Sequence, residues 1–436
     1  MSARSRHCPV VFSTHGPGHH FFGYYDKSPF DREERRMLSH RADHDWKRLA
    51  TAGDTVAIGI WELATGAYRE LATTRAYNWQ QGSMLQWLGP DHTRRIVFND
   101  REGDHFVARI VDVDSGATRT LPLPVYTVSP SGRSAICVNF ERLYFPRPGY
   151  RYEGVVDERW NQPLPKEDGL SWLDLETGEH RLVVSTEDMT RIAPKSSMNG
   201  ATHYLEHAMY APDGARFSFF HCWRLPDGAI YSRLMSANED GSGVRNLVDT
   251  GMVSHQGWRT ASEMSLWGRP ASAVASLRKS KNLTRYFVKP LLPVYHWLWR
   301  ALSLPRGSLV GDTYLLVDDA SGRVEKLAPQ IVFPDNGHCT WRPGDPRWML
   351  TDSYEDEAYH RHLFLYDHAQ GELVEIGSFY SVPETCETGF RCDLHPRWGH
   401  SGDYVCIDST HERGERQMYV VDVRSVVAER AAPSRD

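Results

Sequence analysis

One phrase with residue types suited to metal or proton chemistry recurs in the second half of the chain. A histidine is followed three positions later by a large aromatic residue, in His207-Ala-Met-Tyr210, His255-Gln-Gly-Trp258, His338-Cys-Thr-Trp341 and His395-Pro-Arg-Trp398. A neutral imidazole binds divalent metals, and an imidazole whose pKa is near the working pH accepts a proton. Histidines at one equivalent position of successive repeats would converge if the repeats closed into a ring. We therefore expect a functional set rather than four unrelated structural histidines.

The elements that must position these histidines are short strands in seven repeats. Each repeat begins with a Pro/Gly/Asp turn that leads into an apolar strand, as in Tyr210-Ala-Pro-Asp-Gly214, and ends with an Asp-containing strand and a Gly-marked hairpin, as in Val111-Asp-Val-Asp-Ser-Gly116. Seven such units, each with room for about four strands, predict an all-β fold, a seven-bladed β-propeller. No composition break or linker divides the chain, so we expect a single domain over 1–436.

The fifth unit carries an insertion at about 270–310. It combines a basic stretch, Arg278-Lys-Ser-Lys281, with the aromatic run Tyr295-His-Trp-Leu-Trp-Arg300. This mixture predicts a helical insertion in the fifth blade, a short basic amphipathic helix. A flap packed on the propeller surface is one interpretation, and a peripheral membrane or partner contact is the other.

The first two units supply residues suited to sugars. We interpret Tyr24 as the first-unit equivalent of the repeated histidine, within the run Gly18-His-His-Phe-Phe-Gly-Tyr-Tyr-Asp-Lys27, and the second unit offers Asn78-Trp-Gln-Gln-Gly82 in the same loop position. Aromatic rings stack on pyranose faces, while amides, amines and imidazoles make directional hydrogen bonds. A Gly-rich strand entry that closes the ring is the structural alternative. The predicted substrate-binding residues are His20, Tyr25, Lys27, Gln80 and Gln81.

Arginines near these phrases matter for an anionic substrate. Arg224 follows the His207 strand and is our preferred catalytic arginine; Arg259, Arg391 and Arg397 flank other histidine phrases or serve as surface ion-pair partners.

Three cysteines form a second candidate cluster. Cys339, Cys386 and Cys392, with His255 or His338, have the ligand types of a zinc site, although their spacing is not that of a standard zinc knuckle. Unrelated buried thiols are the alternative.

Net charge, cysteine usage and the absence of long apolar runs narrow the class of protein. The formal charge of −6 over 436 residues gives no electrostatic footprint for nucleic acid. Seven cysteines, an odd number without the spacing of a secreted domain, fit a reducing compartment. No signal-peptide pattern begins the chain, and no apolar run approaches the roughly 18 residues of a membrane span. We expect a cytoplasmic protein.

The repeated histidine phrases resemble motifs of a known family. His207-Ala-Met-Tyr-Ala-Pro, Asn238-Glu-Asp-Gly-Ser, Ser254-His-Gln-Gly-Trp and Leu394-His-Pro-Arg-Trp are similar to motifs of the oligogalacturonate lyases, which are seven-bladed propellers. The motifs cover the chain from His207 onward and the blade pattern covers most of it. Ulvan lyases, propellers with a Cys/His zinc site that act on a uronate-containing polymer, are a second similar group.

The resemblance implies a polysaccharide lyase that cleaves a 4-O-linked uronic-acid-containing glycan by metal-assisted β-elimination. In this family a divalent metal, typically manganese, holds the uronate carboxylate and a histidine removes the C5 proton. His207 falls on the base-bearing phrase, and His255 and His395 fall on metal-ligand phrases. Tyr24 joins His207 and Arg224 as a predicted catalytic residue, and the expected partner is an anionic oligosaccharide or polysaccharide.

The chain departs from the family pattern at two ligand positions. Asp393 stands where the family has a histidine, and Phe390 stands where it has a glutamine. Asp393 can still bind manganese or calcium through oxygen, and His338 can compensate from the neighbouring blade. We therefore predict a metal set of His255, His338, Asp393 and His395, with Mn²⁺ expected and Zn²⁺ or Ca²⁺ as alternatives. The family's catalytic arginine has no firm equivalent here; Arg191 is one candidate.

Two other function classes remain open. One is a non-catalytic carbohydrate-binding or scaffold propeller in envelope polysaccharide biosynthesis. The other is a propeller glycosidase, which needs two opposed carboxylates in the channel; Asp26 and Asp393 are the candidates.

Overall fold

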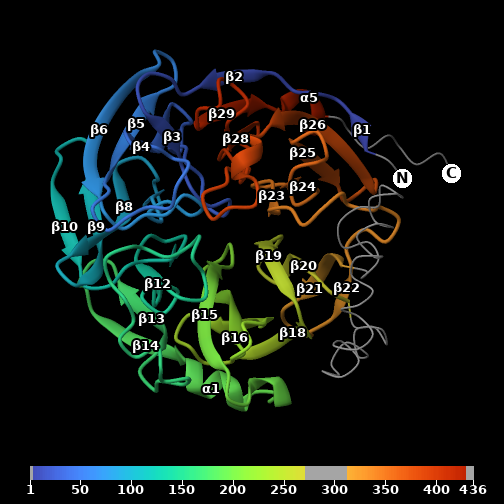
Figure 1. Cartoon of the computed structure of the whole chain (residues 1–436). Coiled ribbons are helices and arrows are strands. Elements are labelled where there is room, and N and C mark those ends of the chain that lie inside the picture. Colours follow the sequence, from blue (N-terminus) through green and yellow to red (C-terminus); the bar gives the residue numbers. More distant parts are fainter. Residues whose placement is uncertain (1–2, 271–311, 429–436) are drawn as a thin grey trace.

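The computed structural model describes residues 3–270 and 312–428, and it is a closed ring of seven β-sheets (Figure 1). This confirms the predicted all-β, seven-bladed propeller. The predicted insertion at about 270–310 lies outside the described residues, so its helical character stays a prediction. The helices of the described part are α1 (Thr186–Arg191), α5 (Arg424–Val427) and the 3-10 turns η1 (Ser196–Met198) and η4 (Pro383–Thr385). In that part no helix is both long and apolar enough to span a membrane.

Blades one to five each consist of four strands that follow one another along the chain. Blade one contains β3 (His19–Phe21), β4 (Arg36–Ala42), β5 (Val56–Glu62) and β6 (Ala67–Thr74). Blade two contains β7 (Gln86–Trp87), β8 (Arg95–Glu102), β9 (His105–Asp112) and β10 (Thr118–Leu121). Blade three contains β11 (Thr127–Val128), β12 (Ser134–Val138), β13 (Gly169–Asp174) and β14 (His180–Ser185). Blade four contains β15 (Thr202–Tyr210), β16 (Arg216–Arg224), β17 (Ile230–Asn238) and β18 (Arg245–Gly251). Blade five contains β19 (Val253–Trp258), β20 (Glu263–Gly268), β21 (Thr313–Asp318) and β22 (Val324–Lys326).

The last two blades take strands from both ends of the chain. Blade six contains β23 (Thr340–Trp341), β24 (Trp348–Asp352), β25 (His360–Asp367) and β26 (Glu372–Tyr380), and β1 (Arg4–Ser5) adds to β26 in parallel. Blade seven contains β27 (Arg397–Trp398), β28 (Tyr404–Ser409) and β29 (Gln417–Asp422), and β2 (Val10–Ser13) adds antiparallel to β29 as its outer strand. The amino-terminal strands therefore lock the ring, a closure that the repeat pattern did not reveal.

The hairpin signals of the sequence have a common local cause. Asp112, Asp174 and Asp318 each accept a hydrogen bond from the backbone N–H three residues on, at 2.9, 2.7 and 2.7 Å. The glycine that follows each turn has a positive φ, as at Gly116 with φ 72°. An aspartate that bonds its own backbone and a glycine in the left-handed region make a tight turn. This turn joins the third strand to the outer strand of the blade.

Backbone hydrogen bonds align the inner ends of all seven blades. In every blade the residue after the repeated aromatic position donates its N–H to the first residue of the second strand; the donors are Asp31, Leu88, Ser129, Ala211, Arg259, Arg342 and Gly399. The residue four positions before each donor occupies the place of the repeated histidine, which we call the ring position. In chain order these residues are Lys27, Met84, Val125, His207, His255, His338 and His395. The first-blade equivalent of the histidines is therefore Lys27, and our interpretation of Tyr24 as that equivalent was wrong. Lys27 lies three positions after Tyr24 in the sequence.

The aromatic residues of the repeated phrase pack between neighbouring blades. The Trp258 indole donates to the Met209 carbonyl of blade four at 3.1 Å, and the Trp341 indole donates to the Ser265 hydroxyl of blade five at 3.1 Å. Each indole is buried and bonds to the neighbouring blade, while the histidine three residues earlier belongs to the converging set. The spacing of the phrase thus couples blade packing to the site.

Candidate functional site

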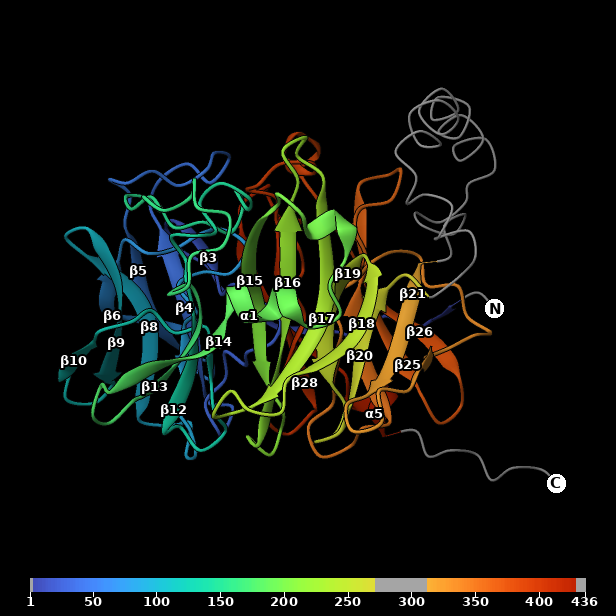
Figure 2. The ribbon, with the colours of Figure 1, turned by 90° about the horizontal axis from the view of Figure 1, so that it is seen from below.

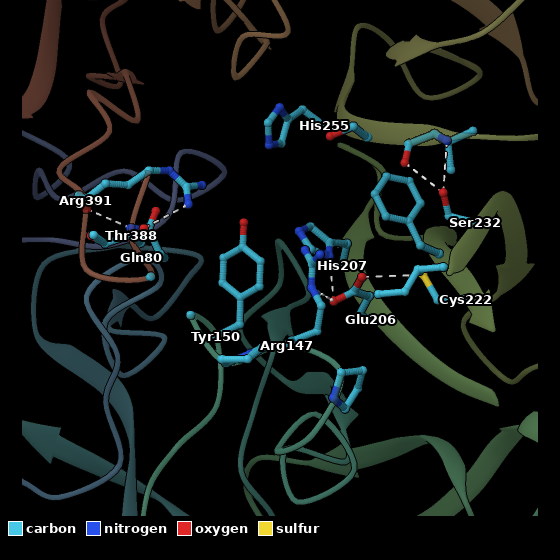
Figure 3. A pocket seen from close by; sticks show the side chains of 18 of the residues that line it. Gln80, Arg147, Tyr150, Glu206, His207, Cys222, Ser232, His255, Thr388 and Arg391 are labelled. Atoms are coloured by element: carbon cyan, nitrogen blue, oxygen red, sulfur yellow. Dashed lines mark hydrogen bonds and ion pairs between the residues drawn. The ribbon is translucent and has the colours of Figure 1, made fainter. Parts of the chain in front are cut away.

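A cavity of about 440 Å³ opens on the face that carries the long loops. Figure 2 shows these loops, including the segment 139–168, rising above one face of the ring. The cavity wall contains His207 and His255 from blades four and five, together with Arg147, Tyr150 and Arg391 from loops on other blades (Figure 3). It is polar and rich in hydrogen-bonding groups, as a carbohydrate site would require.

The four repeated histidines converge, as the sequence predicted. The ring centroids of His255 and His338 lie 4.0 Å apart, and those of His338 and His395 lie 4.3 Å apart. The Tyr24 ring lies 5.3 Å from His207 and 5.2 Å from His395. Tyr24 therefore lies between His207, which lines the cavity, and His395, which does not.

Three of the four predicted metal residues form a group. The candidate ligand atoms of His338, Asp393 and His395 all lie within 4.8 Å of one another, and all three residues are buried. Nε2 of His338 and Nε2 of His395 have no hydrogen-bond partner, and Oδ2 of Asp393 has only an ion pair with Arg391, at 2.8 Å. Buried polar atoms without partners are costly, and a cation would satisfy both imidazole nitrogens. The donor set therefore fits a divalent metal, and His255, the fourth predicted ligand, lies beside the group without completing it.

Neighbouring residues fix how two of these histidines point. The His338 Nδ1–H donates to Asp352 at 2.9 Å, and the His255 Nδ1–H donates to Asn336 at 3.0 Å. With Nδ1 protonated, the lone pair of each ring is on Nε2, which is the usual arrangement behind a metal ligand. Burial and the nearby His338 lower the pKa of His255 and of His395 well below the ordinary value, so both rings are neutral at physiological pH.

A second cluster surrounds His207. Its Nε2 lies 2.6 Å from the Tyr24 hydroxyl, and its Nδ1 lies 3.4 Å from Glu206. Arg147 Nε lies 3.0 Å from the same Glu206 oxygen. Burial alone would raise the pKa of Glu206, but the charge of Arg147 and the interaction with the neighbouring His207 outweigh it and hold that pKa at about 2. Glu206 is therefore a permanent carboxylate beside the imidazole.

Two of the histidines sit on strained backbone. His207 has φ 56° and His395 has φ 42°, both in the left-handed region that residues other than glycine seldom adopt. The register of β15 shifts between Glu206 and Met209, so His207 lies in a bulge. Such strain costs about 1–3 kcal/mol per residue and concentrates at functional sites.

The two arginines of the cavity come from loops on opposite walls. Arg147 belongs to the segment 139–168, which the buried Arg142 anchors by donating to Asp157 at 2.9 Å and to the Gln162 carbonyl at 2.8 Å. Arg391 belongs to the segment before β27, and its carbonyl accepts from Gln80 Nε2 at 2.7 Å. Both arginines face a cavity that can receive an anion.

The predicted substrate-binding residues divide into two groups. Gln80 lines the cavity. Gln81 and Tyr25 lie deeper: Gln81 donates to the Tyr126 hydroxyl at 2.9 Å, and Tyr25 donates to the Gln256 carbonyl at 2.9 Å. The other two, His20 and Lys27, are held elsewhere and do not line the cavity.

These last two have partners of their own. The His20 ring packs on Trp61 within blade one, with ring centroids 5.0 Å apart. Lys27 is buried and pairs with Asp26 at 2.7 Å. Asp26 is thereby committed to a salt bridge, and Asp393 is paired with two arginines, so neither is the free carboxylic acid that a glycosidase requires.

Three further expectations do not match the geometry. Arg224 ends β16 and is not among the residues that line the cavity, although Ile230, its register partner on β17, is. Arg191 lies on α1 and pairs with Glu187 and Asp188. Neither is the arginine of the site.

The cysteines do not form a zinc site either. Cys339 donates to the His255 carbonyl at 3.7 Å and Cys386 to the Val382 carbonyl at 3.5 Å. Within the described residues the one group with metal-ligand geometry contains no thiol. Burial raises the pKa of Cys392 to about 11, which keeps it a neutral thiol.

The sequence analysis missed several residues of the site. Arg147 and Tyr150 are in a long loop inside blade three, and Asp352 is the last residue of β24 in blade six. Nothing in the repeat pattern distinguishes them. Glu206 immediately precedes His207, and that adjacency was the one available signal. Arg391 was noted only as a neighbour of His395.

The fold and the site define a class: a seven-bladed propeller with a buried histidine–aspartate cluster under an arginine-lined cavity.

The sequence matches no protein-family model and no curated protein. Among solved structures the chain is similar to an oligogalacturonate lyase in complex with manganese, with 14% identity, a TM-score of 0.61, and coverage of 98% of this chain and 100% of that one. It is similarly related to the oligogalacturonate lyase from Vibrio parahaemolyticus, with 14% identity, a TM-score of 0.60, and coverage of 95% and 93%. The β-propeller domain of the Trilobed protease from Pyrococcus furiosus follows, with 11% identity, a TM-score of 0.50, and coverage of 92% and 94%. The resemblance to oligogalacturonate lyases is thus confirmed at the level of fold.

Proposed function

We propose that this protein is a lyase that cleaves a 4-O-linked uronic-acid-containing oligosaccharide by metal-assisted β-elimination. The observation that carries the proposal is the convergence of His207 and the His338–Asp393–His395 group beneath one cavity lined by Arg147 and Arg391. β-Elimination next to a carboxylate needs a proton acceptor and positive charge near the carboxylate. This cavity has candidates for both.

Arg147 and Arg391 are the groups proposed to bind and orient the sugar carboxylate. Guanidinium groups pair with carboxylates through two parallel hydrogen bonds, which fix the ring of the sugar relative to the wall. Tyr150, on the same wall as Arg147, offers a ring face for the pyranose. Gln80 offers amide groups to the sugar hydroxyls.

The Tyr24–His207 pair is proposed to accept the C5 proton. His207 takes up one proton, and Glu206 beside its Nδ1 offsets the positive charge that results. As the C5–H bond breaks, its electron pair forms the C4=C5 double bond, and the C4–O bond breaks with its pair on the leaving oxygen. Tyr150 is the proposed donor of a proton to that oxygen. No water is consumed, and the products are an unsaturated uronate and a shortened sugar.

His338, His395 and Asp393, with His255 beside them, would hold a divalent cation. Such a cation, when bound, neutralises the carboxylate and makes the C5 proton more acidic. The mixed imidazole and carboxylate donors favour manganese over calcium, which prefers oxygen ligands alone. The absence of thiols from this group makes a cysteine-bound zinc site the weaker alternative.

A non-catalytic carbohydrate-binding propeller is the second candidate. Its support is the polar cavity alone, because binding a sugar requires neither the strained His207 nor the Glu206 carboxylate beside it. We therefore place it second.

The test is the ultraviolet absorbance of the unsaturated uronate product. The protein is incubated with a panel of uronate-containing oligosaccharides, once with Mn²⁺ and once with a chelator. We expect absorbance to rise with Mn²⁺ and to stay flat with the chelator. A flat trace on every substrate, with Mn²⁺ bound, would instead favour the binding protein.

A further inference from the structure

Asp393 is shared between the candidate cation group and two arginines that differ in freedom. Arg361 NH1 lies 2.6 Å from Oδ1 of Asp393, and Arg361 NH2 donates to Glu355 at 2.8 Å. The Arg361 side chain is only 1% exposed. It is a fixed structural partner that holds one oxygen of Asp393 permanently.

Arg391 contacts both oxygens of Asp393. Its Nε–H donates to Oδ1 at 3.1 Å, and the same nitrogen lies 2.8 Å from Oδ2. Oδ2 is the oxygen that faces His395, whose Nε2 is 3.9 Å away. A cation bound by His395 and Asp393 would need this oxygen. Arg391 therefore covers an atom that the cation requires.

The Arg391 side chain can also turn toward the cavity. It lines the cavity and is 22% exposed, whereas its main chain is held by Gln80 through the Arg391 carbonyl. The guanidinium lies 5.6 Å from the centre of the Tyr354 ring, which also lines the cavity. A rotation of the side chain alone can thus move the positive charge from Asp393 into the cavity.

We propose that the Arg391 guanidinium and a divalent cation compete for Oδ2 of Asp393, so that cation binding releases Arg391 to pair with a sugar carboxylate. The reason is electrostatic: a divalent cation and a guanidinium repel each other at one buried oxygen. This inference rests on the proposed function for its substrate class. It makes Arg391 a positioning residue whose partner depends on whether the cation is bound.

The competition predicts reciprocal coupling. If the cation frees Arg391 for the sugar, the sugar must by linkage strengthen cation binding by the same factor. Coupling between two such sites is commonly about 5- to 150-fold. A sugar carboxylate and Mn²⁺ should therefore each tighten the binding of the other.

Isothermal titration calorimetry tests this without catalysis. The probes are Mn²⁺ and a uronate monosaccharide, which has no glycosidic leaving group at C4 and cannot undergo elimination of a linked sugar. For the unaltered chain we expect Mn²⁺ to bind about tenfold more tightly at saturating uronate than without it. In Arg391→Gln we expect Mn²⁺ to bind more tightly than in the unaltered chain without the sugar. We expect the effect of the sugar to fall to the part that direct contact between the cation and the sugar carboxylate supplies.

Arg147→Gln is the matched control. It also removes one positive charge from the cavity wall, but Arg147 pairs with Glu206 and not with Asp393. We expect it to weaken uronate binding and to leave the Mn²⁺ affinity close to its original value. Circular dichroism of both variants checks the fold, and the comparison with and without uronate in the unaltered chain requires no variant at all.

The outcomes separate the two proposals. If uronate binds but leaves the Mn²⁺ affinity unchanged, or if Arg391→Gln binds Mn²⁺ no better than Arg147→Gln does, the competition is overturned. If the chain binds no uronate but Arg391→Gln still gains Mn²⁺ affinity, the competition stands and the proposed substrate class fails. If no Mn²⁺ binds to any form, the cation site and the competition both fail.

Discussion

The ring position divides the propeller into two unlike parts. Blades one to three hold it with Lys27, Met84 and Val125, whereas blades four to seven hold it with histidines. The backbone hydrogen bonds that define the position are the same in all seven blades. The first part places apolar side chains and a buried salt bridge at this position, and the second places a cluster of imidazoles there. The repeat brings one residue of each blade to an equivalent position, and the residue type there decides whether metal or proton chemistry is possible.

The histidine part is itself uneven. His207 is supported by a carboxylate, Glu206, and by Tyr24, an arrangement for moving a proton. His338 and His395 instead leave nitrogens without partners next to Asp393, an arrangement for holding a cation. Equivalent residues thus serve different proposed roles because their neighbours differ.

The sharpest test of this comparison exchanges residues at one ring position in each part. His207→Ala should lower turnover by about 10²–10⁴-fold, since it removes the proposed proton acceptor. Met84→Leu, at the equivalent position of blade two, should leave turnover close to that of the unaltered chain because it conserves apolar volume. Product absorbance measures both. Equal losses in the two variants would show that the ring position acts through packing alone.

The second test separates the two histidine roles. Asp352→Asn weakens the acceptor that holds the His338 Nδ1–H, and changes of this kind typically cost 10–100-fold in metal affinity. We expect Mn²⁺ binding, measured by calorimetry, to weaken by about that factor. His207→Ala should leave it unchanged. A loss of Mn²⁺ affinity in His207→Ala would mean that His207 belongs to the cation site.

A third test uses pH and the low pKa of Glu206. Its carboxylate is favoured by the folded state, so its stabilising contribution is present above its ordinary pKa of about 4.5 and is lost as pH falls toward 2. With chelator present, the unaltered chain should have a higher thermal midpoint than Glu206→Gln at pH 7. The gap should narrow as the pH is lowered from 5 to 3. A gap that stays constant would contradict the ion pairing of Glu206.

The smallest expected effect concerns the aromatic residues between blades. The Trp341 indole donates to Ser265, whereas the Trp398 indole N–H is buried without a hydrogen-bond partner. Trp341→Phe should therefore destabilise the fold by about 1 kcal/mol more than Trp398→Phe does, the net value of one hydrogen bond. Urea unfolding measures both. Equal costs would mean that these indoles stabilise the blades through shape alone.

The repeats predicted the blades and the convergence of the histidines because both follow from local signals. A turn, an apolar strand and an Asp/Gly hairpin are short-range features, and a ring brings equivalent positions together. Arg147, Tyr150 and Asp352 come from loops and strand ends whose placement depends on contacts distant in sequence. The prediction that Arg224 belongs to the site failed for the same reason. Its place on β16 follows from the local sequence, but its distance from the cavity depends on how the blades and loops pack. The three cysteines of the predicted zinc site have a suitable ligand type, but the fold does not bring them together around one metal position.

The closure of the ring connects the first residues of the chain to the metal half of the site. β1 adds to the blade of His338, and β2 completes the blade of His395, so that these pairings join residues roughly 400 positions apart. During synthesis β2 is made early and has no partner until β29 emerges, and the loop-closure entropy of so long a separation opposes the pairing until then. Removing β1 and β2 would loosen the blades that hold His338 and His395, although neither strand lines the cavity.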